Sequence, residues 1–236
     1  MVKNERIEIL DVLRGIAILG MVFQHILVDL RFVISGINLT LLDNSVLQNI
    51  FVFGGVFFIF LSGISSYYSK HNVRRGLLLL GLGALITAVT YLFFRGEVIY
   101  FGILHFLGAA ILIYALLGKM IRKIPQVVIL IGSMLVFVGA YYLYSLNIRI
   151  ENPLSFLIGF PEWGFYSADY FPIFPYFFAF LGGTGFGWFV FNRKLPQTFY
   201  KLNIPGLNVV GRYSLWIYLL HQPIIILILK IAFGQL

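Results

Sequence analysis

The sequence predicts an all-α fold, a polytopic membrane helical bundle with about seven transmembrane helices. Composition is the first reason. Of the 236 residues, 60% are hydrophobic and 11% are charged, which is more apolar material than a soluble globular domain of this length needs. The second reason is that the apolar residues form continuous runs near 20 residues long. Such runs match the hydrocarbon thickness of a bilayer, whereas the strands of a membrane barrel alternate.

Seven apolar runs can be placed in order along the chain. They cover residues 7–33, 46–69, 74–94, 99–118, 125–145, 171–191 and 210–233. Each is long enough to cross a membrane as a helix. Prolines 172 and 175 stand at the start of the sixth run, where the first turns of a helix tolerate them. The short connections predict one transmembrane domain over residues 1–236.

The positive charges follow the alternation of the connections. They are dense before the first run, between runs two and three, after run four and after run six (Lys3, Arg6, Lys70, Arg74, Arg75, Lys119, Arg122, Lys123, Arg193, Lys194 and Lys201). The other connections carry only Arg31, Arg95 and Arg149. By the positive-inside rule the N-terminus is cytoplasmic and the C-terminus is outside, in a multi-pass protein of the plasma membrane. The net charge of +8 therefore reflects topology and predicts contact with anionic lipid, not with nucleic acid.

Cysteine is absent from the chain, which excludes disulfides, thiolate metal sites and cysteine nucleophiles. No metal site is predicted. The first run is preceded and interrupted by charges, and no small-residue cleavage site follows it. We therefore expect it to remain a transmembrane helix and not to be removed as a signal peptide.

Ionisable side chains gather inside the predicted spans. On a rise of roughly 1.5 Å per residue, Arg14 lies roughly 7 Å to the cytoplasmic side of the midplane and His25 roughly 9 Å to the outer side. Asp29 follows His25 by one helical turn and can orient its imidazole. His105 and His221 are also intramembrane, whereas Arg212 and Ser214 lie at the cytoplasmic end of the last span. Because intramembrane ionisable groups usually face a protein interior or a water-filled cavity, the cluster predicts a functional site.

Structural explanations exist for each of these residues alone. An intramembrane histidine often serves helix packing through one hydrogen bond. Arg14 can neutralise Asp11 or Glu8, and His221 can cap a kink at Pro223. In the connection from Asn147 to Tyr170, the aromatic residues Trp163, Tyr166 and Tyr170 can be interfacial belt residues. Together with Glu162 and Asp169 they can instead line a mouth for a polar substrate.

Four segments carry a resemblance to a known superfamily. Residues 10–25 hold an arginine and, eleven positions on, a histidine, and this segment resembles the first helix of the transmembrane acyltransferases, including acyltransferase type 3. Three further segments resemble the prokaryotic branch of the heparan-alpha-glucosaminide N-acetyltransferase catalytic domain. These are Phe101-Gly-Ile-Leu-His-Phe-Leu-Gly108, Asp169-Tyr-Phe-Pro-Ile-Phe-Pro-Tyr176 and Gly211-Arg-Tyr-Ser-Leu-Trp-Ile-Tyr-Leu-Leu-His-Gln-Pro223. The chain has fewer predicted helices than the larger relatives.

This resemblance implies transfer of an acetyl or other acyl group from cytoplasmic acyl-CoA to a sugar or glycoconjugate at the outer side. His25 matches the catalytic histidine, and Arg14 would help with acyl-CoA or with the integrity of the site. We expect His25 to be the base and Asp29 to orient it. His105 or His221 would stabilise the oxyanion. Arg14, Arg212 and Ser214, together with the basic loops, would lie near the CoA phosphates. Asp169, His221, Tyr170 and Trp163 would bind the acceptor.

Other mechanisms and functions stay open on the sequence. Transfer can be direct or pass through an acyl-histidine. A haem b redox protein could use His25 and His105 as axial ligands. A transporter could use the arginine and the histidines to bind its substrate or relay protons. A homodimer is also left open.

Overall fold

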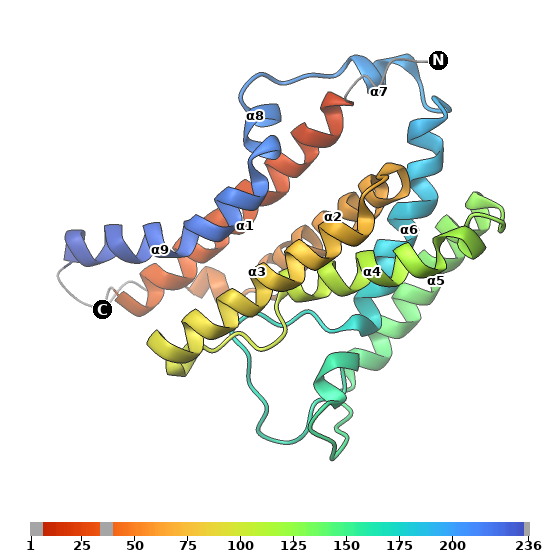
Figure 1. Ribbon diagram of the computed structural model, residues 1–236. Helices are drawn as coiled ribbons and strands as arrows, with labels where there is room; N and C mark the ends of the chain where they lie inside the picture. Colours follow the sequence, from red (N-terminus) through yellow and green to blue (C-terminus); the bar gives the residue numbers. More distant parts are fainter. Residues whose placement is uncertain (1–6, 34–39, 234–236) are drawn as a thin grey trace. The chain divides into compact units, whose positions relative to one another are not determined.

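The computed structural model describes residues 7–33 and 40–233. These residues are mostly helical and contain no β-strand, only one isolated bridge between Phe101 and Tyr170. Seven of the helices are long and apolar enough to cross a membrane. The predicted all-α membrane fold is thus confirmed, and Figure 1 shows the helices in chain order.

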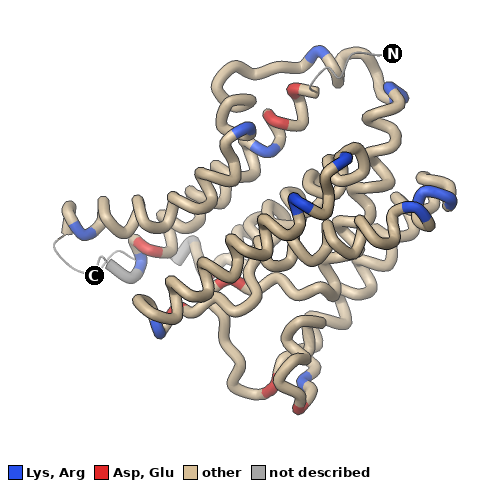
Figure 2. Tube along the Cα trace, viewed as in Figure 1, with Lys and Arg blue, Asp and Glu red and all other residues tan. Residues whose placement is uncertain are grey.

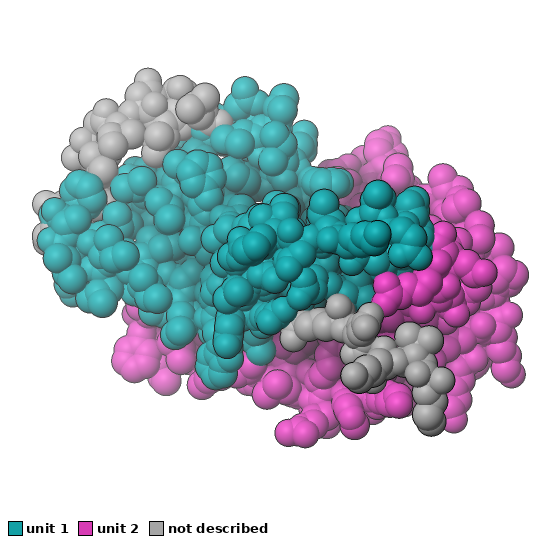
Figure 3. Space-filling view, turned by 90° about the horizontal axis from the view of Figure 1, so that it is seen from above, with its two compact units in different colours: residues 1–61, 195–236 teal, residues 62–194 magenta. Residues whose placement is uncertain are grey.

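By backbone contacts the chain divides into two compact units, coloured separately in Figure 3. Unit 1 comprises residues 1–61 and 195–236, and unit 2 comprises residues 62–194. The single domain expected for residues 1–236 stays a prediction.

Unit 1 is built on two long helices from opposite ends of the chain. Helix α1 spans Glu8–Val33 and helix α9 spans Ser214–Phe233. The short helices η1 (Thr40–Asp43), α7 (Gln197–Lys201) and α8 (Leu207–Arg212) and the first part of α2 (Ser45–Tyr68) complete it. The last predicted span, residues 210–233, was expected to be one helix. It is interrupted at Tyr213, where α8 ends and α9 has not begun.

Close backbone approach holds α1 against α8. A Cβ added at Gly15 would lie 2.2 Å from the carbonyl oxygen of Leu207, and one added at Gly211 would lie 1.7 Å from that of Asp11. Only glycine permits such contact, because any side chain would overlap the neighbouring backbone. The two glycines therefore position the charged first turns of α1 beside the end of α8.

Unit 2 contains the last turns of α2 and four long helices. These are α3 (Asn72–Phe93), α4 (Ile103–Ile121), α5 (Gln126–Ser145) and α6 (Ile173–Phe191), with the 3₁₀ turns η2 (Arg95–Glu97) and η3 (Ser155–Ile158) between them. Phe174 has non-helical dihedral angles, so the regular part of α6 begins beyond it. In this unit the lysines and arginines lie in the connections and terminal turns of the helices, as Figure 2 illustrates.

Helix α4 begins later than the predicted fourth run, which started at residue 99. Residues 98–101 are not helical, and they hydrogen-bond to the segment before α6: the N–H of Ala168 donates to the carbonyl of Val98, and that of Phe171 to the carbonyl of Phe101. These bonds compete with helix formation and place His105 in the first turn of α4.

Candidate active site

Two histidines from opposite ends of the sequence meet in unit 1. His25 of α1 and His221 of α9 have ring centroids 4.9 Å apart, with the ring planes inclined at 58°. One turn further along α1, the Asp29 carboxylate accepts a hydrogen bond of 2.9 Å from Nε2 of Gln222, which is 193 residues away in the chain. The two helices therefore bring polar side chains together at two neighbouring levels: His25 with His221, and Asp29 with Gln222.

The protonation pattern of His221 follows from its hydrogen bond. Its Nδ1 lies 2.6 Å from the carbonyl oxygen of Tyr218, and because a carbonyl can only accept, Nδ1 carries the proton. In the neutral ring Nε2 then holds the lone pair. Among the described residues no hydrogen-bond partner reaches this buried Nε2, nor the buried Oε1 of Gln222. Two unsatisfied acceptors thus lie within the polar contact of α1 and α9, where a donor would be stabilised.

The predicted pairing of His25 with Asp29 stays a prediction. The hydrogen bond described for Asp29 comes from Gln222, a residue to which the sequence analysis gave no role. Gln222 stands between His221 and Pro223, inside a segment that carries the family resemblance, so its position was visible in the sequence. The partner it selects was not, since that depends on how α9 packs on α1.

Arg14 and Arg212 share one buried carboxylate. Nη1 of Arg14 donates to Oδ1 of Asp11 over 2.8 Å, and Nε of Arg212 lies 3.9 Å from Oδ2 of the same residue, whose side chain is 2% exposed. Arg212 also reaches Oε1 of Glu8, at 3.4 Å. This ionic cluster links α1 to α8. The cluster fits a structural role for Arg14, because each guanidinium already has a carboxylate partner.

Ser214 is the first residue of α9, directly after the interruption at Tyr213. It follows Arg212 closely in the chain, and the position of both residues at the cytoplasmic end of the last span stays a prediction. A role for Ser214 in binding acyl-CoA stays a prediction.

His105 lies in unit 2, where its ring contacts Thr87 and Phe101. Its Nε2 is 3.3 Å from Oγ1 of Thr87, whose hydroxyl donates to the carbonyl of Ile99 over 2.5 Å. The hydroxyl proton is thus in use, so Nε2 of His105 is the donor in the contact with Thr87. The ring also stacks on Phe101, with centroids 5.6 Å apart. Such contacts are typical of a structural histidine, and the contact with Thr87 connects α4 to α3.

The predicted acceptor-binding residues of the long loop differ in their surroundings. Oδ2 of Asp169 accepts a hydrogen bond of 2.9 Å from the N–H of Ile103, at the start of α4. The Tyr170 hydroxyl donates to the carbonyl of Phe156, and burial raises its pKa. Trp163 is 78% exposed, with the Arg149 guanidinium 5.9 Å from its ring. Asp169 and Tyr170 are therefore engaged in the loop, and Trp163 is open to its surroundings.

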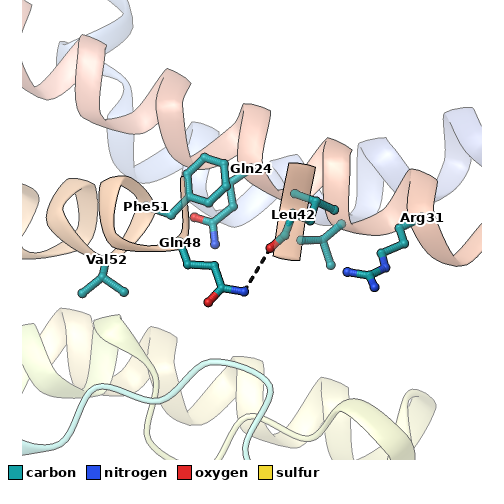
Figure 4. A pocket seen from close by; sticks show the side chains of 7 residues that line it. Gln24, Arg31, Leu42, Gln48, Phe51 and Val52 are labelled. Carbon is teal, nitrogen blue, oxygen red and sulfur yellow. Dashed lines mark hydrogen bonds between the residues drawn. The ribbon is translucent and has the colours of Figure 1, made fainter. Parts of the chain in front are cut away.

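A cavity of about 490 Å³ lies along the face of α1 next to the one that bears His25. Its lining combines apolar side chains with Gln24, Arg31 and Gln48, which Figure 4 labels. Arg31 is paired with Asp43 over 2.8 Å, and the Gln48 amide donates to the carbonyl of Leu42. Within the ranges that the structure describes, no group of three or more His, Asp or Glu side chains is arranged to hold a metal ion.

One family model covers most of the chain. The family described as "Heparan-alpha-glucosaminide N-acetyltransferase, catalytic" matches residues 6–223. This stretch begins just before α1 and ends at Pro223, so it includes both histidines of the pair and the ionic cluster. No curated protein and no solved structure matches the chain.

Proposed function

Because the chain belongs to the heparan-alpha-glucosaminide N-acetyltransferase catalytic family, we propose that it moves an acetyl group from acyl-CoA to a sugar-like acceptor across the membrane. The family makes it a membrane acetyltransferase. The donor, the acceptor and the direction of transfer are the proposal. The thioester arrives from the cytoplasmic side, and the amine or hydroxyl of the acceptor arrives from the outer side.

The pairing of His25 with His221 is the observation that supports this assignment best. Acyl transfer needs a base that takes the proton of the attacking amine or hydroxyl, and a positioned histidine contributes about 10²–10⁴-fold. We assign this role to His25. His221, anchored through Nδ1, offers its Nε2 as an acceptor. A ring N–H of His25 turned toward that atom would leave the lone pair on the other nitrogen of His25, which can then act as the base.

The reaction balances without a further reactant. The acceptor nitrogen or oxygen attacks the thioester carbonyl carbon while His25 takes its proton. The tetrahedral adduct then expels the CoA sulfur, and the proton held by His25 passes to the leaving thiolate. We propose direct transfer. Asp29, held by Gln222, supplies the negative charge that stabilises a protonated imidazole at this contact.

The acceptor is proposed to enter along α1. The cavity of Figure 4 offers the amides of Gln24 and Gln48, which can exchange hydrogen bonds with sugar hydroxyls. The ionic cluster of Asp11, Arg14 and Arg212 is assigned to the integrity of the site.

The test is transfer of a radiolabelled acetyl group. Protein reconstituted in liposomes is incubated with labelled acetyl-CoA and a panel of amino sugars. We expect His25→Ala and His221→Ala each to lower the rate by about 10²-fold or more. Phe23→Ala, on the exposed surface of the same helix, is the matched control and should keep the wild-type rate. Transfer by His25→Ala at that rate would remove His25 from the mechanism.

A further inference from the structure

Unit 2 contains a second cavity, of about 640 Å³, that the catalytic proposal does not use. It is formed by the connection between α2 and α3, the first turn of α3 and the last turns of α4. We call it the basic pocket. Its lining includes the ionisable residues Lys70, His71, Arg74, Tyr114, Lys119 and Arg122.

Four of these lining residues are cationic, and none of the lining residues is a carboxylate. For Lys70, Arg74, Lys119 and Arg122, the structure records no ion pair with an acidic group among the described residues. This distinguishes the basic pocket from the cluster in unit 1, where Arg14 and Arg212 share Asp11. Like charges gathered around one hollow repel each other, so an anion bound there relieves an existing cost.

The start of α3 adds a second attraction for anions. The helix begins at Asn72, and no side chain among the described residues caps it. The amide of Asn72 is used elsewhere: its Nδ2 donates to the carbonyl of Ser66, and its Oδ1 accepts from Arg75. The first backbone N–H groups of a helix have no partner within it, and an uncapped N-terminus is a favourable position for phosphate. The cations and the helix terminus therefore attract the same kind of ligand.

One cation of the pocket is fixed in place. The guanidinium of Arg122 donates to the carbonyl of Tyr67 and, over 3.3 Å, to the hydroxyl of Tyr114. It also lies 4.8 Å from the centre of the Tyr67 ring. A charge that is already oriented loses little freedom on binding. Lys70, Arg74 and Lys119 are exposed and can close on a ligand from the other sides.

We propose that the basic pocket binds the phosphate groups of the acyl-CoA donor, an inference that rests on the proposed function. CoA carries a diphosphate and a separate 3′-phosphate, which match a hollow with several cations. Anionic lipid headgroups present the same phosphate chemistry, so the experiment has an arm for each source.

Binding is measured on the purified full chain in nanodiscs of neutral phosphatidylcholine, by calorimetric titration with CoA. We expect Lys119→Ala and Arg74→Ala each to raise the Kd of CoA about tenfold, since each removes one charge-assisted contact. Lys194→Ala, which removes an exposed charge outside the pocket, should leave the Kd unchanged. Dephospho-CoA, without the 3′-phosphate, should bind the wild type about tenfold more weakly than CoA.

The lipid arm repeats the titration in nanodiscs that contain phosphatidylglycerol. The proposal is supported if the wild type binds CoA with the same Kd in both kinds of nanodisc and only the pocket variants raise that Kd. It is overturned if Lys119→Ala and Lys194→Ala behave alike. It is equally overturned if the wild type binds no CoA in either nanodisc. Because titration needs no acceptor, intact CoA binding without any acyl transfer would count against the proposed reaction and for the pocket.

Discussion

At the residue scale, Asp169 shows how one carboxylate can carry two interpretations. Its position before α6 predicted an acceptor ligand at the outer mouth. In the structure it accepts the N–H of Ile103 and so caps α4 from 66 residues away. A Cβ added at the neighbouring Gly102 would lie 2.4 Å from the same oxygen, so the fit is close. Capping and acceptor binding make different demands on this side chain, and substitutions can separate them.

Asparagine keeps an acceptor oxygen for the N–H of Ile103 but loses the charge, whereas alanine loses both. We therefore expect Asp169→Ala to lower the free energy of unfolding by about 1 kcal/mol, the usual cost of losing a helix cap. Asp169→Asn should stay close to the wild type. Denaturant unfolding in micelles measures the free energy of unfolding of both variants. The acceptor KM of Asp169→Asn supplies the second readout: an increase supports the predicted binding role, and an unchanged KM restricts Asp169 to capping.

At the element scale, the contact of α1 with α8 determines where the charges of unit 1 lie. Gly15 and Gly211 let the two backbones approach, and the approach brings Arg212 to Asp11 and Glu8. Helix α1 also contains Gly20, where an added Cβ would meet nothing within 4 Å. The same substitution at two positions of one helix therefore tests close packing against helix propensity.

Gly15→Ala should destabilise the protein by about 1–3 kcal/mol, because the new methyl group overlaps the carbonyl of Leu207. Gly20→Ala should be neutral or stabilising by up to about 1 kcal/mol, since alanine is the better helix former. Thermal unfolding of the two variants in one detergent makes the comparison. Equal unfolding temperatures would contradict the close contact of α1 and α8.

At the scale of the whole molecule, seven candidate spans and the charge of the connections predict a topology. The dense lysines and arginines mark the cytoplasmic side, so the connection after α6 should be cytoplasmic and the loop before it external. The absence of cysteine makes the chain a ready background for accessibility labelling.

A single cysteine is introduced at Lys194, after α6, or at Glu162, in the loop before it. On intact cells a membrane-impermeant maleimide should label Glu162→Cys and leave Lys194→Cys unmodified, and cell disruption should make both reactive. Both positions are exposed, which removes burial as an explanation. Labelling of Lys194→Cys alone on intact cells would show that the orientation is the opposite of the predicted one.

Local composition and short motifs were enough to establish the class of the protein and its candidate polar residues. Seven continuous apolar runs follow from local composition, and all seven appear as long helices. The segments around His25, His105, Asp169 and His221 were sufficient to indicate the family that the comparison confirmed. These properties are readable because hydropathy and short motifs depend on neighbours in the chain.

Helix packing, in contrast, selects which polar groups meet. It paired His25 with His221, Asp29 with Gln222, and Arg14 and Arg212 with Asp11. It also separated α8 from α9 at Tyr213 and gathered Lys70, Arg74 and Lys119 around one cavity. Partners far apart in the chain are selected by helix packing and by glycines that allow close approach. No local pattern encodes that choice, since each of these side chains had several possible partners before the helices were placed.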